Sequence, residues 1–114
     1  MTANERLERE ERNHRMTKAE EAFIKDAGPR WHKALAAAAM HIRSDRRFVG
    51  LDKIREPAIH RAALLALGGE FPSPALARIA EESKYQDGFM KSLDALIYEA
   101  AKLAREAAAR KALA

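Results

Sequence analysis

The 114-residue chain contains no cysteine, so disulfide bonds and thiolate metal sites are excluded. No apolar run approaches the ~20 residues that a membrane-spanning helix needs. The first fifteen residues are charged throughout and lack the apolar segment of a signal peptide. We therefore expect a cytoplasmic protein of one domain that makes no contact with a membrane.

Motifs for catalysis and for metal binding are also missing. The serines occupy positions typical of helix caps, turns and surface, and no glycine-rich phosphate loop is present. His32 and His41 are nine residues apart, so they face opposite sides of a helix. Glu56 and His60 are four apart, but the Glu-x-x-His pair that a di-iron bundle requires is absent. We therefore expect no metal, no cofactor and no enzymatic activity.

What the chain does contain is alanine, the strongest helix former, together with apolar residues at helical spacing. These features predict an all-α fold, a compact bundle of four to five helices that spans residues 17–104. Residues 1–16 are predicted to be a charged extension, either helical or disordered, and residues 105–114 an alanine-rich helical tail. Their charges give the bundle charged helical extensions at both ends.

Capping and breaking residues predict where the helices begin and end. Thr17 and Glu20 have the spacing of a reciprocal capping box, and Gly28-Pro29 separates two helices. The predicted elements are a helix at Arg30–Phe48, a connection or single turn at 51–56, a buried helix at Ala58–Leu67 with Pro57 in its first turn, a helix at Pro74–Ser83, a turn at Lys84–Gly88 and a last helix from Phe89 to about Leu113. Ser73 is the expected N-cap of the helix at Pro74–Ser83, which is predicted to bury Leu76, Ile79 and Ala80.

The helix predicted at Arg30–Phe48 combines an apolar face with a basic end. Trp31, Leu35, Ala38 and Ile42 recur on one side, and small alanines widen that side so that neighbouring helices can approach. Cations crowd its last turns, where unpaired carbonyl groups favour positive charge. Each arginine there is explained by the helix end alone, but the charge continues beyond it.

Charge is segregated along the chain. Residues 30–61 hold eight Lys or Arg and three Asp or Glu, a net charge of +5, whereas residues 62–99 hold three and six, a net charge of −3. Such segregation favours an anionic partner or a self-complementary surface. The candidate contact residues for a phosphate backbone are Lys33, Arg43, Arg46, Arg47, Lys53, Arg55, Arg61, Lys102 and Arg105.

Residues 58–98 have the order helix, turn, short helix, turn, helix, a spacing that resembles a helix-turn-helix. The helix in the recognition position begins at Asp87, contains Lys91 and Asp94 near its start and has no arginine in its first turns. That charge is unsuited to base and phosphate contacts. The spacing is also common in bundles that never bind DNA, and we prefer that interpretation.

Our leading hypothesis is a small non-catalytic binding protein that contacts an anionic partner, most readily a nucleic acid backbone, alone or as an accessory subunit of a nucleoprotein complex. The alternative is a protein-interaction module, an adaptor, inhibitor or oligomerising subunit, without nucleic acid contact. Its partner would be an acidic protein surface or a second copy of the chain. The sequence alone leaves both open.

Overall fold

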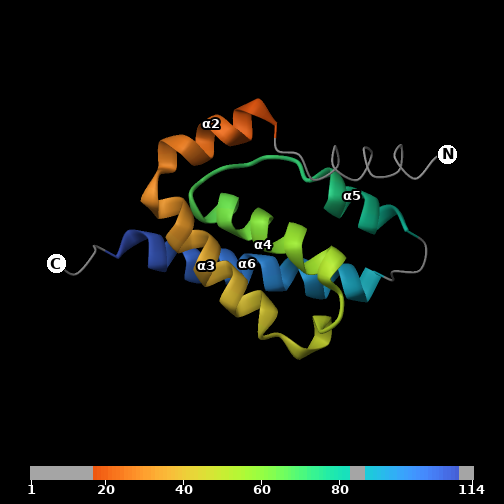
Figure 1. Ribbon diagram of the computed structural model, residues 1–114. Coiled ribbons are helices and arrows are strands. Elements are labelled where there is room, and N and C mark those ends of the chain that lie inside the picture. Colours follow the sequence, from red (N-terminus) through yellow and green to blue (C-terminus); the bar gives the residue numbers. More distant parts are fainter. Residues whose placement is uncertain (1–16, 83–86, 111–114) are drawn as a thin grey trace.

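The computed structural model describes residues 17–82 and 87–110, and every regular element in these ranges is helical (Figure 1). The elements are α2 (Lys18–Ala27), α3 (Pro29–Arg43), the 3-10 turn η1 (Arg46–Phe48), α4 (Asp52–Ala66), α5 (Pro74–Glu81) and α6 (Asp87–Ala109). The predicted all-α bundle is therefore confirmed. The predicted extension at 1–16 and the end of the predicted tail, 111–114, lie outside the described residues. Among the described helices, none has the length and hydropathy to cross a bilayer.

Helices α3, α4 and α6 form the centre of the bundle, and alanines line their contacts. The core alanines that are fully inaccessible to solvent are Ala34, Ala38, Ala58, Ala62, Ala63, Ala100 and Ala104. Side chains that stop at Cβ let helix backbones approach closely. Larger side chains fill the space between them, with Ile42, Phe48, Leu93 and Leu96 the largest that are fully buried. The predicted apolar stripes of α3, α4 and α6 therefore face this core.

Helices α3 and α6 lie antiparallel (Figure 1). Near the start of α3, the Lys33 Nζ donates a 3.0 Å hydrogen bond to the carbonyl oxygen of Arg110, just past the end of α6. Nearer the end of α3, the His41 Nε2 lies 3.4 Å from a carboxylate oxygen of Glu99. The start of α3 and the end of α6 therefore lie at the same end of the bundle.

The predicted helix at Arg30–Phe48 is wrong beyond Arg43, where α3 ends. Asp45 adopts an extended conformation, and its Oδ1 accepts a 2.9 Å hydrogen bond from the backbone N–H of Arg47. This local side-chain bond competes with helix continuation and starts the separate turn η1. The turn directs Phe48 into the core, where 1% of the residue remains exposed.

Helix α4 begins at Asp52, so residues 52–56, predicted as a connection or single turn, form the start of this helix, and Pro57 lies inside it rather than in its first turn. Proline lacks an N–H, so the carbonyl of Lys53 loses its helical partner. Burial of Ile54 and Pro57 against the core offsets that loss. Gly50, with φ of +81°, provides the sharp turn that precedes α4.

Helix α6 starts at Asp87 instead of Phe89, so the predicted turn at 84–88 is two residues too long at its end. Residues 84–86 of that turn lie outside the described part of the chain. Helix α5 has the predicted cap, since the Ser73 Oγ accepts a hydrogen bond from the N–H of Leu76 at 3.3 Å. Ile79 is buried as predicted, but Ala80 is exposed.

Helix α2 covers one side of the bundle through an aromatic contact and a polar contact. Phe23 meets the ring of Phe71 edge to face, with centroids 5.5 Å apart. The predicted N-cap is confirmed, because the Thr17 Oγ1 accepts from the N–H of Glu20 at 3.2 Å. The reciprocal half of the capping box is not formed: the carboxylate of Glu20 turns inward to His60 instead.

Candidate functional site

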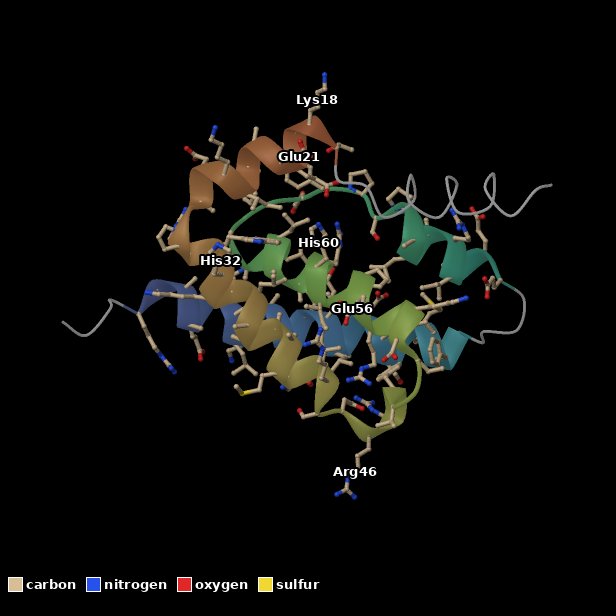
Figure 2. All side chains as sticks on the ribbon, viewed as in Figure 1. Lys18, Glu21, His32, Arg46, Glu56 and His60 are labelled. Atoms are coloured by element: carbon tan, nitrogen blue, oxygen red, sulfur yellow. The ribbon has the colours of Figure 1, made fainter. Side chains whose placement is uncertain are left out.

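The junction between α3 and α4 brings together five of the nine candidate contact residues. We call this group the basic corner, and it consists of Arg43, Arg46, Arg47, Lys53 and Arg55. Helix α3 contributes its last residue, η1 two arginines and the first turn of α4 the other two cations. Arg46 extends away from the body of the molecule at this end (Figure 2). Phe48, buried beneath the turn, fixes η1 to the core.

Three acidic residues of the same corner neutralise part of this charge. Arg43 forms a 2.8 Å ion pair with Glu56, and Arg47 forms one of the same length with Asp45. Arg55 lies 3.6 Å from a carboxylate oxygen of Asp52. With five cations and three anions, residues 43–56 carry a net charge of +2.

Arg46 and Lys53 are the two cations of the corner without such a partner. Both side chains are exposed, and neither forms a hydrogen bond or ion pair with another residue in the described ranges. Their donors are therefore directed to solvent. An incoming anion would reach them without breaking an internal interaction.

The Asp45–Arg47 pair shifts the pKa values of both of its members. Hydrogen bonds from the Arg47 side chain, at 2.8 and 3.1 Å, lower the pKa of the Asp45 carboxyl below its usual value. The same hydrogen bond raises the pKa of Arg47. The Arg47 guanidinium also lies over the Phe48 ring, 5.6 Å from its centroid. Arg47 is thus held in one orientation, but the Asp45 carboxylate offsets its positive charge.

Arg55 is the least exposed cation of the corner, with 14% of its side chain accessible. Its Nη2 donates a 3.2 Å hydrogen bond to the carbonyl oxygen of Arg43, one of the unpaired carbonyls at the end of α3. Its Nε is buried and has no hydrogen-bond partner within residues 17–82 and 87–110. The structure therefore gives Arg55 a positioning role, since it ties the start of α4 to the end of α3.

The other four candidate residues lie elsewhere and do not join this surface. Lys33 and Arg43 are ten residues apart on α3, about 15 Å along the helix axis. Arg105 donates from its Nε to the carbonyl of Ala66 at 3.4 Å, and Lys102 is exposed on the same helix. Arg61 donates to the carbonyl of Phe71.

A second polar group, which the sequence did not predict, lies between α2 and α4. The Oε2 of Glu20 is 3.3 Å from the Nε2 of His60, and only 10% of the Glu20 side chain is exposed. The predicted capping box would have the Glu20 carboxylate reach back to the start of α2, which is wrong because the carboxylate turns toward α4. His60 also meets the edge of Trp31, with ring centroids 5.4 Å apart. A histidine within the apolar helix α4 was the available signal, but its partner is forty residues away in the sequence.

The helices α4, α5 and α6 have the order that resembles a helix-turn-helix. The buried Leu93, Leu96 and Ile97 of α6 face the bundle core. Near the start of α6, Lys91 and Asp94 are both exposed, so one cation and one anion offset each other there. Lys91 and Asp94 together therefore carry no net positive charge that would attract phosphate to the start of α6 rather than to the basic corner.

Comparisons with models of known families, with curated proteins and with solved structures find no match to this chain. Within the described residues, no three His, Cys, Asp or Glu side chains converge in a group suited to hold a metal ion. The functional interpretation therefore depends on the geometry and charge of the chain itself.

Proposed function

We propose that this protein is a non-catalytic, cytoplasmic binding protein whose basic corner contacts an anionic partner, most readily a nucleic acid backbone. The observation that supports the proposal best is the convergence of five cations from α3, η1 and α4 on one end of the bundle. Arg46 and Lys53 are the principal contacts because their charges are free. Arg43 and Arg47 add charge that acids partly offset.

The helix ends at the corner also favour an anion. Leu51 supplies no side-chain cap to α4. The N–H groups of Ile54 and Arg55 donate to the Leu51 carbonyl, whereas those of Asp52 and Lys53 have no backbone partner in the described ranges. The end of α3 has the opposite, negative polarity, and Arg55 covers one of its carbonyls. The positive end of α4 therefore keeps two N–H groups beside the cations, while the negative end of α3 is partly covered.

The charge of the corner predicts the character of the binding. Contacts from lysine and arginine to phosphate are independent of sequence and weaken steeply with salt. Since three acids offset the five cations, we expect a dissociation constant in the range of non-specific binding, about 10⁻⁴–10⁻⁶ M at physiological salt. A role as an accessory subunit of a nucleoprotein complex fits this range, because other subunits would add specificity.

Fluorescence anisotropy with a labelled DNA or RNA oligonucleotide tests the proposal. The double variant Arg46→Ala/Lys53→Ala removes the two free cations and should weaken binding at low salt. The matched control is Lys18→Ala/Arg78→Ala, which makes the same change in net charge at exposed positions of α2 and α5. Figure 2 shows Lys18 and Arg46 at opposite ends of the molecule. Equal weakening by the two variants, or no binding at low salt, would refute the assignment.

The alternative, a protein-interaction module with an acidic or self-complementary partner, is favoured by four large apolar side chains on the surface. They are Met40, Val49, Tyr98 and Leu103, which are 76%, 66%, 66% and 42% exposed. This alternative predicts a mass that rises with protein concentration in light scattering, or a protein partner in a pull-down, and its loss when residues 1–16 are deleted. A monomer that retains nucleic acid binding would exclude it.

A further inference from the structure

We propose that the cleft beside Glu20 binds a small molecule that has an apolar body and a protonated amine. The cleft is open to solvent on one side and is lined by residues of α2, α3, α4, the connection from α4 to α5 and the start of α5, and its volume is about 360 Å³. That volume lies at the lower end of the range of small-molecule sites. We call it the Glu20 cleft.

Apolar side chains form most of the walls. Leu35 comes from α3, Ile59 and Leu64 from α4, and Phe71 and Pro72 from the connection to α5. These groups would bury the hydrocarbon part of a ligand, which needs no hydrogen-bond partners there. Small-molecule sites typically combine such walls with a few polar groups that orient the ligand.

Glu20 is the polar group that selects the ligand. Its side chain is nine-tenths buried, and a carboxylate loses much hydration in such a place unless several donors replace the water. Within the described residues its Oε2 has one side-chain partner, His60, at 3.3 Å. Among the described residues, no side chain or backbone group donates to its Oε1, and this atom is not sealed from solvent. A carboxylate accepts about four hydrogen bonds, so this one retains acceptor capacity that faces the cleft.

His60 holds that carboxylate in place. The edge-to-face contact with Trp31 supports the imidazole from the core side, while its Nε2 faces Glu20. Glu56 lies one turn earlier on the same helix, so a second carboxylate stands at the cleft rim (Figure 2). Glu56 is occupied by Arg43, which leaves Glu20 as the acceptor for the ligand.

The remaining charged group of the lining, Arg61, is less suited to select a ligand. Its Nη1 donates to the carbonyl oxygen of Phe71, in the wall of the cleft. This bond ties the α4–α5 connection to α4 and uses part of the guanidinium. The buried group with free capacity is therefore an anion, and the complementary ligand is a cation with donor hydrogens.

Phenethylamine is a probe of this chemistry, and 3-phenylpropionate and 2-phenylethanol are anionic and neutral comparators of similar size. Each is titrated into the full-length protein and followed by the amide chemical shifts in nitrogen-15 NMR. The amine should shift resonances of residues around the cleft and bind about tenfold more tightly than the alcohol. The alcohol O–H can also donate to the carboxylate, but only the ammonium group adds the attraction of an opposite charge. Equal binding of all three, preference for the acid, or no binding would overturn the proposal.

Two variants and a matched control localise the effect. Glu20→Gln should weaken phenethylamine binding about tenfold or more, whereas Glu21→Gln, the same charge change at an exposed neighbour, should leave it unchanged. Ala75→Phe places a ring at the cleft lining without altering the carboxylate, and it should abolish binding. If circular dichroism shows that Glu20→Gln is not folded, the binding of phenethylamine to Ala75→Phe provides the test instead. Amine binding that survives Ala75→Phe, or falls equally with Glu21→Gln, contradicts the assignment.

Discussion

Replacement of Phe48 by alanine should destabilise the protein strongly, because this side chain anchors the basic corner to the core. Phe48 is 1% exposed, and its ring meets Phe89 edge to face with centroids 5.4 Å apart. Truncation of a buried phenylalanine to alanine costs about 3–5 kcal/mol. A domain of this size has about 5–15 kcal/mol of stability in total, so the loss is a large share of it.

Urea unfolding followed by far-UV circular dichroism measures this loss, and a thermal melt should show a decrease in Tm of about 12–20 °C. Val49→Ala is the matched control, because Val49 follows directly in the chain and is 66% exposed. The control should stay within about 0.5 kcal/mol of the wild type. If Phe48→Ala costs no more than Val49→Ala, the turn η1 is not anchored by this ring and the geometry of the corner described above is incorrect.

Three further substitutions test other parts of the structure. Asp45→Asn should lower stability at neutral pH, because Arg47 lowers the pKa of Asp45 below 3.8 in the folded protein. The stability that the Asp45 carboxylate contributes is present above pH 3.8 and is lost as the pH falls through its folded-state pKa, so the urea midpoints of variant and wild type should converge in acid. Ala38→Leu adds bulk at a fully buried helix contact and should cost about 1–3 kcal/mol or more in urea unfolding; an unchanged midpoint would disprove close packing of α3. Gly69→Ala would place a Cβ 2.9 Å from the ring of Phe23 and should lower Tm, whereas an unaltered melt would show that the ring moves aside freely.

Local patterns in the sequence predicted most of the fold. The caps at Thr17 and Ser73 are confirmed because each uses a hydrogen bond within three residues. The start of α4 was not predicted, since Pro57 is a strong local signal for a first helical turn. The tertiary burial of Ile54 and Pro57 outweighs that signal, and such burial depends on helices that are distant in the sequence.

The sequence predicted the sign of the charge on the candidate surface but not how its individual cations are paired. Clustering in the sequence indicates a basic segment, and the structure gathers five of its cations at one corner. Their internal pairing depends on long-range geometry, as between Arg43 and Glu56, which are thirteen residues apart. The Glu20–His60 pair spans forty residues and has no local signature at all. Patterns of charge therefore predicted where positive residues are, but not which of them remain free.

The salt dependence of nucleic acid binding tests the central claim most directly. Each phosphate neutralised on a DNA duplex contributes about −0.9 to the slope of log K against log salt concentration. Removal of Arg46 and Lys53 together should therefore make the slope shallower by about 1.8, while Lys18→Ala/Arg78→Ala should leave it unchanged. A slope that is the same in the wild type and in Arg46→Ala/Lys53→Ala would contradict the basic corner as the site of contact.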